Sequence, residues 1–195
     1  MTGIFDFILH IDEHLKLMIQ VYGVWVYVIL FLIVFVETGL IVMPLLPGDS
    51  LLFAAGALAA AGNNVGLNIW YLMPLLILAA LCGDNVNYFT GRFFSDQIKK
   101  RNRILFFKRE YIEKTEAFYD KHGRQAIIMA RFVPIVRTIA PFVAGASRMS
   151  YMVYLTYCIV GAILWVVGIG MLGYIFGNVP IVKDNFEKVV FLIIF

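Results

Sequence analysis

The sequence predicts an all-α polytopic membrane protein with inverted repeats, each containing a re-entrant broken-helix hairpin, plus spanning helices. Hydrophobic residues make up 62% of the 195-residue chain and charged residues only 15%, whereas soluble domains carry about 25% charged residues. The mean hydropathy is +0.85. Apolar runs approach the ~20 residues that a spanning helix needs, and two of them are interrupted by prolines and charges. We therefore expect residues 1–195 to form a single transmembrane domain.

The first segment, residues 1–20, contains acids and histidines where a cleavable signal needs a basic leader. We expect it to be retained as an interfacial helix on the membrane surface. The formal net charge of +3 is too small and too localised to indicate nucleic-acid binding. Cys82 and Cys158 lie in apolar runs without metal-ligand spacing, which favours buried small side chains over a disulfide or a metal site.

The apolar region over residues 22–61 is about twice the length of one span. Its only charged residues are Glu37 and Asp49. A first span is expected from residue 22 to about residue 37 or 43. The residues that then break the helix are Pro44, Pro47 and Gly48.

A second helical piece, "DSLLFAAGALAAAG", follows with Asp49 or Ser50 as its N-cap. About a dozen residues are too few to cross a bilayer, so this piece predicts a re-entrant hairpin over about residues 37–62. Such a hairpin is tolerated only where protein covers its open backbone or where it lines a wet cavity. The next segment, "LNIWYLMPLLILAALCGDNVNYFTGR", is long enough to span, and it completes a first half over residues 22–91.

Residues 92–124 hold most of the lysines and arginines of the chain, with acids among them. By the positive-inside rule this connector is cytoplasmic. The interleaved acids favour a solvated helical connector over a polybasic surface that binds the membrane.

The second half, residues 125–195, begins with the interrupted segment "QAIIMARFVPIVRTIAPFVAGASRMS". Each central arginine, Arg131 and Arg137, would cost roughly 2.5 to 3.5 kcal/mol in a lipid-facing helix. We therefore predict a second broken hairpin over about residues 126–148. A span follows, and the closing apolar run is too short to cross, so we expect a final span that is cut off. The helix breakers of this hairpin are Pro134 and Pro141.

Glu37 and Asp49 belong to the first hairpin, and Arg131 and Arg137 to the second. Burying four charges separately would cost on the order of 10 kcal/mol, so we expect them to meet around a small hydrated cavity near the midplane. Arginine binds phosphate through bidentate hydrogen bonds and stays protonated when desolvated, which implies an anionic substrate. Burial disfavours the charged form of a carboxyl group, which makes the acids candidates for proton coupling.

Other interpretations of these residues stay open. Asp49 could cap the helix that follows it, and Glu37 could be a structural partner of an arginine. Arg131 and Arg137 could snorkel to an interface. Asp84, in "CGDNVNYFTGR", is expected to hold helices or an arginine through hydrogen bonds rather than to couple protons directly.

Four stretches carry a family resemblance: "FVETGLIVMPLLPGDSLLFAAGALA", "GDNVNYFTGR", "KHGRQAIIMARFVPIVRTIAPFVAGASRMS" and "LGYIFG". Together they resemble the DedA family of bacterial inner-membrane proteins, within the group of SNARE-associated or VTT-domain proteins. The resemblance implies paired re-entrant hairpins, lipid translocation and dependence on the proton motive force. It carries the essential acidic and basic positions of the family onto Glu37, Asp49, Arg131 and Arg137.

The arginines and acids favour a phosphate-bearing substrate with proton coupling, and the resemblance implies that the protein is a flippase for a lipid. We expect a lipid phosphate, with undecaprenyl phosphate first among the candidates, because members of the family differ in substrate. The alternatives are a phosphatidylethanolamine scramblase, a proton-coupled transporter of small ions, and a scaffold without transport. An enzyme is not expected, because no histidine lies in a predicted membrane segment to act as a nucleophile. We expect no metal ion and no cofactor; the partners are membrane lipids and protons, and a homo-oligomer is left open. The supporting positions are Asp84, Pro44, Pro47, Gly48, Pro134, Pro141 and Gly145.

Overall fold

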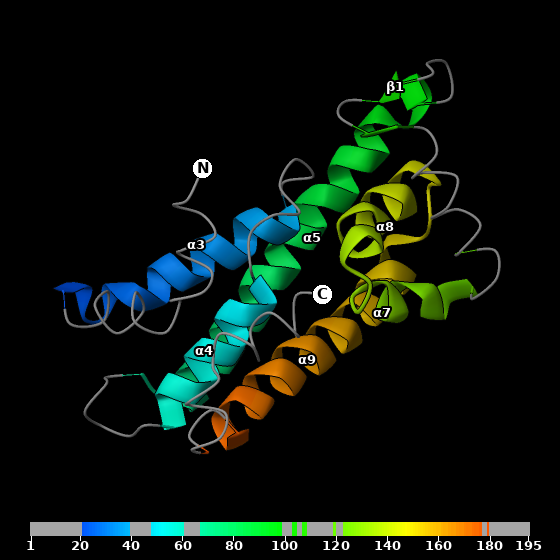
Figure 1. Cartoon of the computed structure of the whole chain (residues 1–195). Coiled ribbons are helices and arrows are strands. Elements are labelled where there is room, and N and C mark those ends of the chain that lie inside the picture. Colours follow the sequence, from blue (N-terminus) through cyan, green and yellow to red (C-terminus); the bar gives the residue numbers. More distant parts are fainter. Residues whose placement is uncertain are drawn as a thin grey trace. The chain divides into compact units, whose positions relative to one another are not determined.

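The computed structural model describes most of the chain that the sequence assigns to the membrane (Figure 1). The described residues are 21–39, 48–60, 67–98, 103–104, 107–108, 119, 123–176 and 179. Their elements are helices, apart from two strands of two residues each. The predicted interfacial helix, Pro44, Pro47, most of the connector and the closing apolar run lie outside the described residues.

Two helices are long and apolar enough to cross a membrane. They are α5, Ile69–Ile98, and α9, Tyr151–Phe176. The apolar part of α5, Ile69–Phe94, and the whole of α9 each have 26 residues. The expected first span is a shorter apolar helix, α3, Trp25–Gly39, of 15 residues. At 1.5 Å per residue its helical part measures about 22 Å, against about 30 Å of hydrocarbon.

The chain divides into two compact units. Unit 1 consists of Met1–Ile33, Pro47–Leu76 and Val166–Phe195, and unit 2 consists of Val34–Leu46 and Ile77–Trp165. The helices α3, α5 and α9 each contribute residues to both units.

In unit 1, the short helix α4, Gly48–Ala60, is buried along nearly its whole length. Small side chains allow this burial, because they let backbones approach closely. A Cβ on Gly56 would overlap the carbonyl oxygen of Gly170, and a Cβ on Gly173 would overlap that of Phe53. The last part of α9 therefore packs directly against the backbone of α4.

In unit 2, two short helices replace the continuous helix that an apolar segment of this length could form (Figure 1). They are α7, Ala126–Ala130, and α8, Pro134–Ala146. The break precedes the proline: Val133 has an extended backbone, with φ −115° and ψ 107°, because the ring of a following proline disfavours the helical conformation. A 3-10 turn, η1, Gly123–Gln125, leads into α7.

The core of unit 2 joins α5, α8 and α9. The rings of Tyr88 and Tyr154 stack with centroids 4.4 Å apart, and both side chains are fully buried. A Cβ on Gly145 would overlap the carbonyl oxygen of Tyr88, and a Cβ on Gly91 would overlap that of Phe142. The two helices α5 and α8 therefore touch through their backbones.

The helical connector expected over residues 92–124 is wrong at residues 103–104 and 107–108, which form strands. β1, Arg103–Ile104, pairs antiparallel with β2, Phe107–Lys108. The interleaved acids Glu110, Glu113, Glu116 and Asp120 lie outside the described residues, whereas apolar residues dominate the segment between Arg103 and Lys108. Helix α5 itself continues to Ile98, beyond the predicted end of the span.

Candidate functional site: two buried arginine–carboxylate pairs

Arg131 forms a buried ion pair with Asp84. The arginine lies in the turn after α7, and its Nη2 donates to Oδ2 of Asp84 on α5. The two side chains are 5% and 4% exposed. Its other terminal nitrogen, Nη1, is buried and makes no hydrogen bond within the part of the chain that is described. Since a buried charge is costly without a partner, Asp84 is the residue that makes this position of Arg131 possible.

One face of α9 encloses this pair. The thiol of Cys158 accepts from Nη2 of Arg131 and donates to Oδ2 of Asp84, both at 3.3 Å. The Tyr154 hydroxyl donates to the backbone carbonyl of Asp84 at 3.0 Å. Gly161 leaves room for the guanidinium arm, because a Cβ there would lie 3.0 Å from Cδ of Arg131. The spacings of four and three residues place these α9 positions on one side of the helix.

Arg137 forms the second ion pair, with Glu37. Arg137 is in the first turn of α8 and Glu37 in the last turn of α3. Nη2 lies 2.7 Å from Oε1, and the side chains are 9% and 1% exposed. The guanidinium carbon also lies 5.0 Å from the centroid of the Trp165 ring on α9, within the range of a cation–π interaction.

Asn87 of α5 connects the backbones next to both members of the Glu37–Arg137 pair. Its Nδ2 donates to the carbonyl of Thr138 at 2.8 Å and to that of Thr38 at 3.4 Å. Asn87 is fully buried. It therefore restrains the ends of α3 and α8 where the two charged side chains begin.

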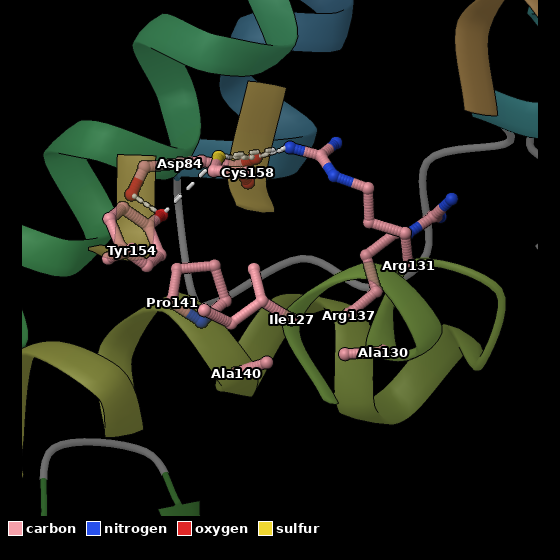
Figure 2. A pocket seen from close by; sticks show the side chains of 9 residues that line it. All are labelled: Asp84, Ile127, Ala130, Arg131, Arg137, Ala140, Pro141, Tyr154 and Cys158. Carbon is pink, nitrogen blue, oxygen red and sulfur yellow. Dashed lines mark hydrogen bonds and ion pairs between the residues drawn. The ribbon is translucent and has the colours of Figure 1, made fainter. Parts of the chain in front are cut away.

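A small cavity lies beside the Arg131–Asp84 pair. Figure 2 shows the guanidinium of Arg131 pointing toward Asp84 and Cys158, with Ala130 and Ala140 on the two short helices below. The cavity has a volume of about 10 Å³, which corresponds to one water molecule. In this structure carboxylates hold both arginines. The cavity lining consists of Asp84, Ile127, Ala130, Arg131, Arg137, Ala140, Pro141, Tyr154 and Cys158.

Tyr119, from the connector, contacts α8. The Tyr119 hydroxyl donates to the carbonyl of Ala140 at 2.9 Å, next to the cavity. Burial raises the pKa of Tyr119 above its usual value, so the phenol stays protonated and this hydrogen bond persists across the physiological pH range.

Of the predicted charged site residues, the structure brings together Glu37, Arg131 and Arg137 in unit 2, with Asp84. The expectation that an acid of the first hairpin pairs with Arg131 differs from the structure, where Asp84 does so. The reason is local: α7 ends at Ala130 and the turn directs Arg131 toward α5. Asp49 lies in unit 1, in the first turn of α4, the place where an acid stabilises a helix N-terminus.

The helix breakers occupy defined places where the structure describes them. Gly48 is the first residue of α4. Pro134 is the first residue of α8, so the break lies before it and Arg137 lies in the first turn of a helix. Pro141 lines the cavity, and Gly145 is the contact point with α5.

Sequence reasoning missed Tyr154, Cys158, Trp165 and Asn87. Cys158 was interpreted as a small buried hydrophobe, yet it contacts both charges of one pair. The available signal was the recurrence of Tyr154, Cys158, Gly161 and Trp165 on one face of an otherwise apolar span. Among the described residues, no three His, Cys, Asp or Glu side chains gather in a way that could hold a metal ion.

Two apolar helices long enough to span a membrane, with ion pairs buried between helices, match a helical membrane protein, the class that the names of the relatives below state. The VTT domain model matches residues 46–175. The chain belongs to the DedA family, which confirms the resemblance seen in its motifs. It is 53% identical over 185 residues to Protein DedA of Escherichia coli K12, covering 95% of this chain and 84% of that protein.

Two further relatives have lower identity to this chain. An uncharacterised membrane protein of Mycobacterium leprae is 47% identical over 163 residues, covering 84% of this chain and 72% of the relative. Inner membrane protein YqjA of Escherichia coli K12 is 33% identical over 155 residues, covering 80% and 69%. No solved structure gives a significant match.

Proposed function

We propose that this protein is a proton-coupled flippase that moves a lipid phosphate across the bacterial inner membrane, with undecaprenyl phosphate as the substrate. The observation that supports this most is the pair of buried arginines, each held by a carboxylate inside an apolar helical unit. A carboxylate and a phosphate present similar oxygen acceptors to a guanidinium. A site built from exchangeable arginine–carboxylate pairs is therefore suited to bind a phosphate and release it.

In this proposal the whole chain is one transporter domain of two inverted halves, with residues 92–124 on the cytoplasmic side. The 13-residue helix α4 and the broken pair α7 and α8 serve as the ends of two re-entrant hairpins. The burial of α4 supports this assignment, because short membrane segments are tolerated where protein covers them. No bond is made or broken, and no cofactor takes part.

Transport requires the site to open, since the cavity of about 10 Å³ holds no more than one water molecule. Protonation of a carboxyl group weakens its ion pair, which frees an arginine to bind the headgroup. Glu37 is placed to do this for Arg137, at 2.7 Å. Asp49 is proposed as a further proton-coupling acid, at a step other than headgroup loading. The lipid tail remains in the bilayer while the two hairpins rock around the headgroup.

The test is uptake of labelled undecaprenyl phosphate by proteoliposomes that contain the full chain under a proton gradient. Arg137→Ala should abolish transport, whereas the matched control Arg124→Ala, at an exposed position in η1, should leave it unchanged. Transport by Arg137→Ala at the wild-type rate would refute this site. Movement of phosphatidylethanolamine but not of undecaprenyl phosphate would show that the proposed substrate is wrong. Proton flux without lipid movement would show that the protein does not transport lipid.

A further inference from the structure

We propose that protonation of Asp84 releases Arg131, just as protonation of Glu37 releases Arg137, so that loading one lipid phosphate takes up two protons. The inference rests on the proposed transport of a lipid phosphate and gives Asp84 a direct role beyond support. It begins from the finding that the two arginines have different carboxylate partners, on α5 and on α3. Neutralising one acid leaves the other ion pair in place.

Asp84 has few groups that could stabilise its charge once Arg131 turns to a phosphate. Its carboxylate is almost fully buried, and the hydrogen bond from the thiol of Cys158 is weak. A buried carboxylate without its counter-ion takes up a proton. The charged and titratable side chains that face it among the described residues are Arg131, from the turn after α7, Arg137, from α8 across the shared cavity, Tyr154 and Cys158, from α9, and Tyr119, from the connector.

Arg131 already has a donor available for the phosphate. Its Nη1 is buried, makes no hydrogen bond within the described part of the chain, and belongs to a residue that lines the cavity. A buried donor of this kind is costly unless an acceptor reaches it. A phosphate oxygen that enters the opened cavity would satisfy Nη1 and would replace Asp84 on Nη2.

The charges balance. In the present state two arginines face two carboxylates, and the site is neutral. A phosphate monoester carries a charge of about −1.5 to −2 near neutral pH, so a neutral loaded site contains two arginines, one phosphate and two protonated carboxyl groups. Both protons come from the aqueous phase and form one O–H bond each, on Glu37 and on Asp84. They leave when the phosphate departs.

The experiment measures binding of geranylgeranyl phosphate to the purified full chain across a pH series. The slope of log Kd against pH counts the protons taken up on binding. Asp84→Asn should lower this slope by about one proton relative to the wild type and should tighten binding at high pH. Asp84→Glu, which restores an acid, should recover the wild-type slope. The matched control is Asp96→Asn, more than three turns further along α5; the ligand's own titration is common to all variants.

An unchanged slope in Asp84→Asn, with binding intact, would overturn the role of Asp84 and leave the proposed function standing. No binding by the wild type at any pH, with geranylgeraniol as the uncharged comparison, would overturn the proposed function itself. Should Asp84→Asn fail to fold, difference infrared spectra of the wild type on adding the phosphate decide the matter. Two protonated-carboxyl bands are expected, one of which Glu37→Gln removes; a single band that Glu37→Gln abolishes would contradict the proposal.

Discussion

Arg131 is stabilised at its buried position by neighbours from two other segments of the chain. Asp84 supplies the opposite charge from α5, Cys158 bridges the two charges, and Gly161 provides the space along α9. Without Asp84 the guanidinium would be an uncompensated buried charge, which is strongly destabilising. A change in any one of them acts on the ion pair rather than on the protein surface.

The Glu37–Arg137 pair allows stability and function to be separated. Arg137→Gln leaves Glu37 buried without its cation and should lower the free energy of unfolding by about 3–5 kcal/mol. The double variant Glu37→Gln/Arg137→Gln should recover most of that loss, because no buried charge remains, yet it should transport no lipid phosphate. Thermal unfolding in detergent and proteoliposome uptake measure the two effects. A double variant as unstable as the single one would show that the pair is not the reason for the loss.

At the scale of elements, contact between α5 and α8 depends on two glycines. Gly145→Ala should destabilise unit 2 by about 1–3 kcal/mol, the usual range for overpacking, because its methyl group would overlap the backbone of Tyr88. The midpoint of thermal unfolding gives the measurement. Gly168→Ala in α9 is the matched control, since a Cβ there meets nothing within 4 Å. Equal midpoints for the two variants would contradict this account of the packing.

The sequence predicted the elements better than their partners. Length and hydropathy located the spans that became α5 and α9, and "PGD" located the start of α4. The sequence predicted that Asp84 could hold an arginine but not which one, because helical periodicity relates residues within one helix but not across helices. The direction of Arg131 depends on the turn between α7 and α8, and Val133 adopts its extended conformation there only because a proline follows.

At the scale of the whole molecule, the charge distribution predicts orientation. The basic residues of the 92–124 connector should place it in the cytoplasm. A protease site inserted after Lys114 should resist protease added to spheroplasts and should be cut in inverted membrane vesicles. Immunoblotting of the fragments provides the measurement, and cleavage in intact spheroplasts would reverse the proposed orientation of both halves.

The contact between Arg137 and Trp165 makes Trp165 an intrinsic fluorescent probe of the position of Arg137. Of its three tryptophans, Trp25 and Trp70 are 68% and 82% exposed, whereas Trp165 is 1% exposed and lies against the guanidinium. With the two exposed indoles replaced by phenylalanine, the remaining fluorescence comes from one ring. A shift in the emission wavelength of Trp165 then reports when the guanidinium of Arg137 moves away from the ring, and no attached dye is needed.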